Sequence, residues 1–136
     1  MSTKIVNNMD PIANLLTSIR NGYLARKDNV EVPYSKMKES LLQLFAQKGF
    51  ILSYEKTTTD GKTNLIISLH YLKSGSPVLT GIKKISKPGV RLYTGVDKIP
   101  PMAGAGFSVL STSKGLLTDE QARAQNIGGE IICQVW

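Results

Sequence analysis

The sequence is poor in the residues from which disulfides and metal sites are built. Its 136 residues include one cysteine, Cys133, and one histidine, His70. A single cysteine cannot form an internal disulfide, which makes a reducing compartment the simpler expectation, and its apolar neighbours favour a core residue over a reactive thiol. The histidine lies in a strand pattern without a second histidine or cysteine to complete a metal site. We therefore expect no disulfide, no metal and no cofactor.

Long apolar runs are also missing. No run approaches the roughly 20 residues that a membrane-spanning helix needs. The segment Met1–Met9 lacks the apolar core of a secretory signal, and its one basic residue is too few for a typical transit peptide. These absences predict a cytoplasmic protein with no membrane partner and with a short frayed extension before the first helix.

Catalytic constellations are absent as well. Residues 111–114 match the pattern Ser-x-x-Lys, but the companion motifs of a serine acyl-transfer enzyme do not occur. Gly104 and Gly106 lack the third glycine of a dinucleotide fingerprint, and there is no P-loop. Asp119 and Glu120 are adjacent in the first turn of a predicted helix, where they suit the helix dipole better than a shared acid–base site. We expect no catalytic residue and no small-molecule substrate.

Positive charge is what the sequence has in excess. Seventeen Lys and Arg against ten Asp and Glu give a net charge of +7, and the pI is near 9.6. Such a balance favours a polyanionic partner, although solubility alone is the competing explanation. No acidic residue occurs between Asp60 and Asp97. The cations of that segment are Lys62, Lys73, Lys83, Lys84, Lys87 and Arg91. Lysines that guard a sheet edge would produce part of the same pattern.

Two helices are predicted in the N-terminal part. Asp10 is an N-cap before Pro11, and the apolar face that follows should end at Gly22. Ser35 is a second N-cap, and Gly49 lies beyond the end of that helix. The expected buried stripe of the second helix is Met37, Leu41, Leu44 and Phe45.

Strand patterns complete an N-terminal α+β unit. A short extended piece over 30–32 precedes the second helix, and strands over 50–57 and 64–72 flank an Asp60-Gly61 turn. Residues 73–77 have linker chemistry, so we place the N-terminal domain at 1–72 and the C-terminal domain at 78–136.

The C-terminal domain is predicted to be mainly β with one short helix. Strands over 78–86, 90–93 and 107–110 are separated by a turn at 87–89 and by the Pro-rich and Gly-rich stretch of 100–106. Thr118 and Gln121 form a capping box for a helix that runs to about Gln125, and a closing strand follows from 130 to 136. The fold class is α+β with two small domains.

Several polar and basic residues are candidates for RNA contact. Residues 111–115 are predicted to form one exposed turn, where short hydroxyls could meet a ribose, Lys114 a phosphate, and Gly115 would let the backbone come close. A plain chain turn with a solvated lysine is the alternative. The turn residues are Ser111, Thr112, Ser113, Lys114 and Gly115, and the expected phosphate contacts are Lys83, Lys84, Lys87, Arg91, Ser35, Lys36, Arg20 and Asn21. Ser35 and Lys36 lie at a helix N-terminus that offers N–H groups to an anion, whereas Arg20 could simply suit the helix dipole.

These motifs, in this order, resemble one family over nearly all of the chain from Asp10 onward. The chain is similar to the bacterial-type small-subunit ribosomal protein S-eight family. The resemblance rests on residues 10–13, 19–22, 49–51, 86–93, 111–115 and 128–130.

The resemblance implies a two-domain primary binder of an irregular helix in the central domain of small-subunit ribosomal RNA, with other ribosomal proteins as neighbours. It also implies that Glu130 faces the RNA together with the turn at 111–115, with Tyr93 close by, and that a messenger RNA is bound in some members. The short helix lacks the family's usual basic residue, so Arg123 alone would contact phosphate there. Cyanobacterial and plastid relatives share the terminal Trp136, which keeps a plastid ribosome as the alternative location.

Two other functions compete with a structural ribosomal role. One is a stand-alone RNA-binding regulator or assembly factor, and the other is a small hydrolase that uses Ser111 and Lys114. Salt-resistant association with small ribosomal subunits would favour the ribosomal role, salt-labile association the regulator, and turnover lost in Ser111→Ala the hydrolase.

Overall fold

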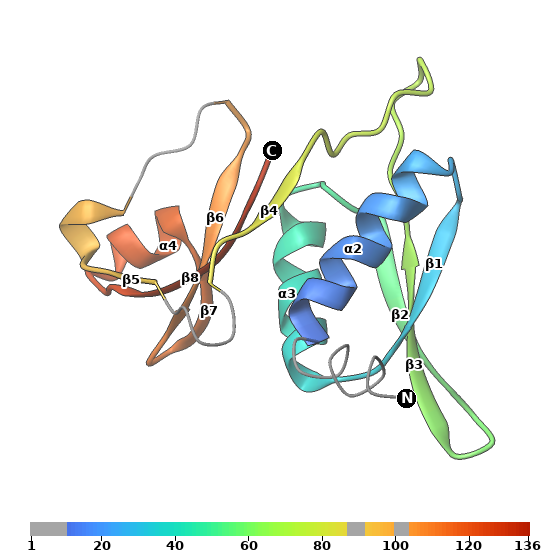
Figure 1. The fold of residues 1–136 in the computed structure, drawn as a ribbon, viewed down its shortest axis with the longest axis horizontal. Coiled ribbons are helices and arrows are strands. Elements are labelled where there is room, and N and C mark those ends of the chain that lie inside the picture. The colour runs from blue at the N-terminus through green and yellow to red at the C-terminus, as the bar shows by residue number, and fades with distance from the viewer. Residues whose placement is uncertain (1–10, 87–91, 100–103) are drawn as a thin grey trace. The chain divides into compact units, whose positions relative to one another are not determined.

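In the part of the chain that the structure describes, helices combine with two antiparallel sheets, which confirms the predicted α+β class (Figure 1). The computed structural model describes residues 11–86, 92–99 and 104–136. Two compact units divide the chain, Met1–Thr80 and Gly81–Trp136. The expected N-cap at residue 10, the turn at 87–89 and the prolines at 100 and 101 lie outside the described residues.

The first unit begins with the helix α2 (Pro11–Leu24). Its apolar face is buried as predicted, but the helix runs two residues past Gly22, so the predicted end is wrong. A Cβ at Gly22 would lie 2.5 Å from Val30 Cγ1. Gly22 therefore permits close packing of helix on strand, and the chain turns later, at Arg26, where φ is +59°.

The second helix, α3 (Lys36–Gln47), confirms the predicted N-cap, since the Ser35 hydroxyl accepts a hydrogen bond from the N–H of Lys38. The predicted stripe is wrong at one position, because Met37 is 48% exposed and Lys38 is 8% exposed. Residues 38, 41, 42 and 45 follow the helical period, and Met37 falls one residue off it. Lys38 Nζ donates to the carbonyl of Pro33 at 3.1 Å, and burial lowers the pKa of this ammonium.

Three strands form the sheet of the first unit, in the order β1-β3-β2, and α2 and α3 cover one of its faces (Figure 1). They are β1 (Asn29–Pro33), β2 (Ser53–Thr59) and β3 (Lys62–Ser68). The predicted Asp60-Gly61 turn is confirmed, with φ of +53° and +75°. Both predicted strands are displaced towards this turn.

The displacement has a physical cause at His70, which the sequence pattern placed in a strand. The N–H of His70 donates to the hydroxyl of Tyr23 at 3.1 Å, and that hydroxyl donates to the carbonyl of Phe50 at 2.5 Å. A buried side chain therefore replaces the strand ladder at this point. Burial raises the pKa of the Tyr23 hydroxyl.

A hydrogen-bonded turn follows in the first unit. Tyr71 bridges to Pro77, and the N–H of Leu72 donates to the carbonyl of Ser76 at 2.8 Å. The linker expected over 73–77 falls within this turn, and the predicted domain boundaries stay predictions.

Among the described residues, the second unit is a sheet with one short α-helix and one 3-10 helix. Its elements are β4 (Ile82–Lys84), β5 (Tyr93–Thr94), the 3-10 helix η1 (Val96–Lys98), β6 (Phe107–Thr112), β7 (Gly115–Thr118), α4 (Asp119–Ala124) and β8 (Gly129–Val135). The strand β8 pairs with β6 on one side and with β4 and β5, end to end, on the other. The exposed turn predicted over 111–115 is partly wrong, because Ser111 and Thr112 belong to β6 and Gly115 begins β7.

Helix α4 is fixed to this sheet by its cap and by a buried carboxylate. The capping box of Thr118 and Gln121 is confirmed. Asp119 is 6% exposed, and its Oδ1 accepts a hydrogen bond from the N–H of Ser108 in β6. Ala122 packs with Leu110 in the core of the unit. The first turn of α4 therefore stabilises the fold of this unit.

Cys133 generates a prediction about alkaline stability. It is fully buried in β8 as expected, and burial raises the pKa of its thiol from 9.0 to about 12. Because the pKa of this thiol is higher in the folded than in the unfolded state, the protonated thiol contributes its full stabilisation of the fold below pH 9. This contribution is lost as pH rises towards the folded pKa. Between pH 9 and 11, the free energy of unfolding should fall less steeply in Cys133→Ala than in the wild type, by up to about 1.4 kcal/mol per pH unit. Denaturant titrations of both proteins measure the difference, and parallel curves would contradict it.

Candidate nucleic-acid interface

Three strands place three of the predicted site residues in one line. Tyr93 of β5 pairs with Glu130 of β8, and Glu130 pairs with Ser111 of β6. Directly paired residues in antiparallel strands point their side chains to the same face of the sheet. Tyr93 is 73% exposed, and Glu130 and Ser111 are half-buried. We call these residues the Tyr93–Glu130–Ser111 row.

Two glycines let the strands of the row come together. A Cβ at Gly129 would lie 2.3 Å from the carbonyl oxygen of Ser111, and a Cβ at Gly128 would lie 2.4 Å from the carbonyl oxygen of Thr94. Any side chain at either position would therefore have to displace the backbone of a neighbouring strand. The left-handed turn after α4 is made by Asn126, with φ of +58°, so Gly128 and Gly129 serve the close approach of the strands rather than the end of the helix.

The β6–β7 hairpin carries the remaining residues of the predicted turn (Figure 1). The Thr112 hydroxyl donates to the carbonyl of Gly115 at 2.8 Å and accepts from the N–H of Lys114 at 3.1 Å. This hydroxyl holds the turn closed, and φ of +96° at Gly115 explains the glycine. Ser113 and Lys114 are exposed at the tip. The hairpin thus presents one hydroxyl and one ammonium to solvent beside the row.

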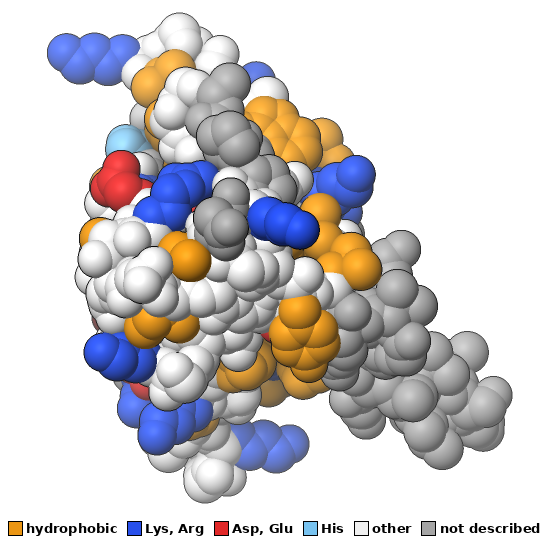
Figure 2. Space-filling view, turned by 90° about the vertical axis from the view of Figure 1, so that its left-hand side faces the viewer, with side chains coloured by type: hydrophobic (Ala, Val, Ile, Leu, Met, Phe, Trp, Pro, Cys, Tyr) orange, Lys and Arg blue, Asp and Glu red, His pale blue; other side chains and the backbone are white. Residues whose placement is uncertain are grey.

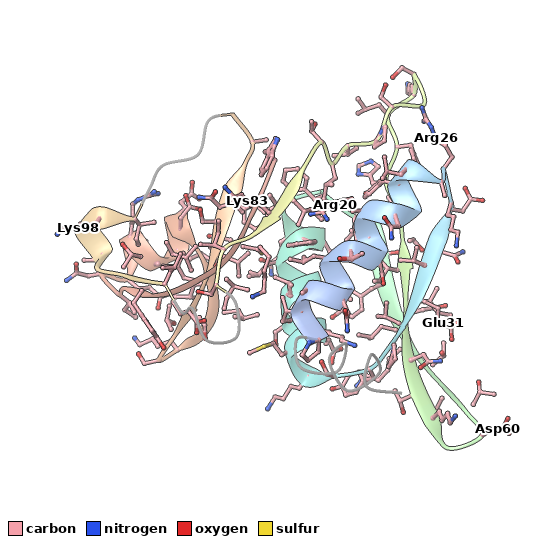
Figure 3. The ribbon with its side chains drawn as sticks, in the orientation of Figure 1. Arg20, Arg26, Glu31, Asp60, Lys83 and Lys98 are labelled. Carbon is pink, nitrogen blue, oxygen red and sulfur yellow. The ribbon has the colours of Figure 1, made fainter. Side chains whose placement is uncertain are left out.

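Two predicted phosphate contacts lie on β4, which pairs with β8 along the same edge as β5. Lys83 pairs with Gln134 and is exposed, and Lys84 pairs with Cys133 and donates from Nζ to the carbonyl of Ser86. Gln134 lies four positions after Glu130 in β8, which corresponds to about 13 Å along a strand. Figure 3 shows Lys83 projecting from β4. Lys87 and Arg91 lie outside the described residues.

Arg123 of α4 is engaged within the unit. Its Nη2 lies 3.3 Å from Asp119 Oδ2 and 3.4 Å from the carbonyl oxygen of Ile99. These bonds hold the guanidinium against η1 and the first turn of α4. Lys98 of η1 is an exposed cation in this unit that the sequence analysis did not single out (Figure 3). Its place becomes evident only from the short helical turn that carries it.

The other predicted contacts belong to the first unit. Arg20 and Asn21 are exposed on α2. The Ser35 hydroxyl caps α3 by accepting from the N–H of Lys38, and the neighbouring Lys36 is exposed. Asn21 lines an open groove of about 530 Å³ between α2 and β1. The groove is lined by Ser18, Asn21, Gly22, Ala25, Lys27, Asn29, Val30 and Glu31. The polar residues of this groove that follow the helix could not be predicted from the sequence, because only the packing of β1 against α2 brings them together.

Cationic side chains do not form one dense patch on the face that Figure 2 draws. Figure 2 shows Lys and Arg spread over the face that it draws, with few acidic side chains among them. Such a distribution suits a partner whose charge is also spread out, as in a nucleic-acid backbone.

Comparison of the chain with known proteins identifies its family. The family model described as "Ribosomal protein S8" matches residues 10–136. The chain belongs to the ribosomal protein S8 family. The resemblance inferred from the motifs is therefore confirmed.

Individual S8 relatives match nearly end to end. The small ribosomal subunit protein uS8 of Clostridioides difficile is 50% identical over 129 residues, which is 93% of this chain and 97% of the relative. The uS8 protein of Lactobacillus delbrueckii is 49% identical over the same shares of both chains. The uS8 protein of Nostoc punctiforme is 43% identical, again over 93% of this chain and 97% of the relative.

The described residues of this S8 family member lack two further features. Across residues 11–86, 92–99 and 104–136, no three His, Cys, Asp or Glu residues group as a metal site would require. In the same part of the chain, no helix has the length and apolar character needed to cross a membrane.

The close approach at Gly129 generates the second prediction. Gly129→Ala should lower the free energy of unfolding by about 2–3 kcal/mol, because the new Cβ overlaps the Ser111 carbonyl. Gly104→Ala is the matched control, since no atom lies within 4 Å of its Cβ and only its φ of +62° opposes the change. That variant should lose about 1 kcal/mol. Thermal and denaturant unfolding measure both, and equal losses would contradict the crowding at Gly129.

Proposed function

We propose that this protein is a structural constituent of the small ribosomal subunit and binds an irregular helix in the central domain of small-subunit ribosomal RNA. The main observation in support of this proposal is the Tyr93–Glu130–Ser111 row beside the hairpin tip, in a chain of net charge +7. Membership of the S8 family supports the proposal, since the relatives are named small ribosomal subunit proteins.

Each group of the row suits a different feature of folded RNA. The half-buried Ser111 and the exposed Ser113 can donate to and accept from ribose 2′-hydroxyls. Glu130 only accepts hydrogen bonds when ionised, so its partners are base amino groups or donors of its own loop. The exposed ring of Tyr93 offers a face on which an unstacked base can stack. Together these groups favour irregular RNA over a continuous duplex, whose bases are already stacked and paired.

Charge supplies the less selective part of the binding. Lys114 at the hairpin tip, and Lys83 and Lys84 on β4, are placed in the same unit as the row. In our proposal Lys87, Arg91 and Arg123 add phosphate contacts there, and Ser35, Lys36, Arg20 and Asn21 add them on the first unit. These contacts attract and orient the RNA without reading its sequence.

The proposed role needs no chemical turnover. Ser111 lies within a strand pair with Glu130, and the Thr112 hydroxyl is used to close the hairpin turn, so the sheet and its turn account for the placement of both residues. We therefore place the protein in the cytoplasm as a non-catalytic part of the ribosome, next to other small-subunit proteins. A messenger RNA that presents the same irregular fold would meet the same residues, which is the physical basis of a feedback role.

The first test of this proposal is a binding titration over several salt concentrations. The protein should prefer a central-domain fragment of small-subunit ribosomal RNA to a paired duplex of equal length, and the preference should persist as salt rises. Ser113→Ala should weaken binding to the fragment by about fivefold with little effect on the duplex, since one hydrogen bond is lost. Ser53→Ala, an exposed serine on β2, is the control and should change neither. Equal, salt-labile binding to both RNAs would refute specific recognition.

The second test separates phosphate contact from recognition. Lys83→Ala should weaken binding to the fragment and to the duplex alike, and should lower the slope of log K against log salt by about 1. Lys62→Ala removes an exposed lysine at the β2–β3 turn of the other unit and should leave the slope unchanged. An unchanged slope in Lys83→Ala would show that Lys83 is solvated in the complex.

A further inference from the structure

We propose that Ser86 is a positioning residue of the RNA site, because its hydroxyl holds Leu92 in place and thereby sets Tyr93 beside Glu130. This inference rests on the proposed function and names a residue that cannot itself contact RNA. Ser86 is 0% exposed. Its contribution to binding would come entirely through the strand that it orders.

The hydroxyl of Ser86 meets both backbone polar groups of Leu92. Its Oγ accepts a hydrogen bond from the N–H of Leu92 at 2.9 Å and lies 3.5 Å from the carbonyl oxygen, as a long and weaker donor. The same carbonyl accepts from the N–H of Ile131 at 2.8 Å. Ser86, Leu92 and Ile131 thus form a connected set of bonds between the end of β4, the start of β5 and the strand β8.

The strand that carries Tyr93 needs this support. β5 consists of Tyr93 and Thr94 alone, and so short a strand has few ladder bonds of its own. β4 is better anchored, with three paired residues and a further bond of 3.0 Å from the N–H of Ile85 to the carbonyl of Ile132. Ser86 directly follows Ile85, so its hydroxyl ties the weaker strand to the firmly paired one.

The Tyr93 ring has little other means of being fixed. At 73% exposure it is not held by a core, so its position depends on the backbone that carries it. A ring placed before binding saves the ordering free energy that a loose ring would lose on contact with RNA. Removing the Ser86 hydroxyl should therefore weaken recognition while every RNA contact remains chemically available.

Ser86→Ala is the direct test, and Ser108→Ala is its matched control. Ser108 is also 0% exposed, but its hydroxyl accepts from Gln134 Nε2 at 3.4 Å and does not touch β5. We expect Ser86→Ala to bind the ribosomal RNA fragment roughly tenfold more weakly, with the salt slope unchanged because no phosphate contact is lost. Ser108→Ala should bind like the wild type. Equal affinities in the two variants would overturn the proposal.

A double-mutant cycle asks whether Ser86 acts through Tyr93. Tyr93→Ala removes the ring, so the further loss on adding Ser86→Ala should shrink to less than about twofold, since residues acting as one unit are not additive. Fully additive losses would mean that Ser86 influences binding by another route, and would overturn the assignment.

Amide hydrogen exchange in the free protein tests the clamp without RNA. In Ser86→Ala the amides of Leu92 and Ile131 should exchange at least about tenfold faster, whereas the amide of Val109 in the centre of β6 should not change. Unchanged exchange at Leu92 and Ile131 would refute the clamp. If exchange quickens but the wild type does not prefer the ribosomal fragment, the proposed function fails and the positioning role for RNA fails with it.

Ser86→Thr keeps the hydroxyl and guards against a general loss of folding in the alanine variant. It should retain slow exchange at Ile131 and bind close to the wild-type level. A threonine variant with slow exchange at Ile131 but an affinity as low as that of Ser86→Ala would overturn the proposal, because the bond would then be present without its effect.

Discussion

The pairing of β8 along both of its edges is the constraint on which the C-terminal unit depends. On one edge β8 holds β6, and on the other it holds β4 and the very short β5. Gly128 and Gly129 make this possible, because any Cβ there would meet a carbonyl oxygen at 2.3–2.4 Å. The Tyr93–Glu130–Ser111 row exists only because these three backbones lie in register. The same constraint fixes the place of the hairpin tip.

Buried polar groups organise this surface, and exposed ones are left to meet a partner. The buried Ser86 and Asp119 and the half-buried Thr112 each accept a hydrogen bond from a backbone N–H within the unit, where they fix β5, α4 and the hairpin turn respectively. Buried groups of this kind must be paired, because an unsatisfied donor or acceptor costs about 1–3 kcal/mol. Ser113 and Lys114, by contrast, are exposed at the tip of the β6–β7 hairpin. Two neighbouring hydroxyl residues of the turn therefore have different roles, since Thr112 stabilises the turn and Ser113 is exposed to a partner.

Local sequence rules predicted the local structure well and failed where a distant residue intervened. The cap at Ser35, the capping box at Thr118 and the Asp60-Gly61 turn depend on neighbours within three or four residues, and all three are present. The predicted helix end at Gly22 failed because Val30 packs against that glycine. The strand predicted to continue through His70 failed because the Tyr23 hydroxyl accepts its N–H. The strand β7 was not predicted, because residues 111–115 have the composition of a turn and β7 is defined only by its pairing with β6.

The sequence by itself determined the α+β class, the basic character and the family of this protein, since composition, period and motif order are properties of the chain alone. Only the tertiary structure decided which residues stand together at the proposed RNA site. Residues 93, 111 and 130 are far apart along the chain, and an irregularity between Val109 and Leu110 shifts the β6–β8 register just before Ser111. A shift of one residue turns a side chain to the opposite face, so alignment depended on packing rather than on local preference.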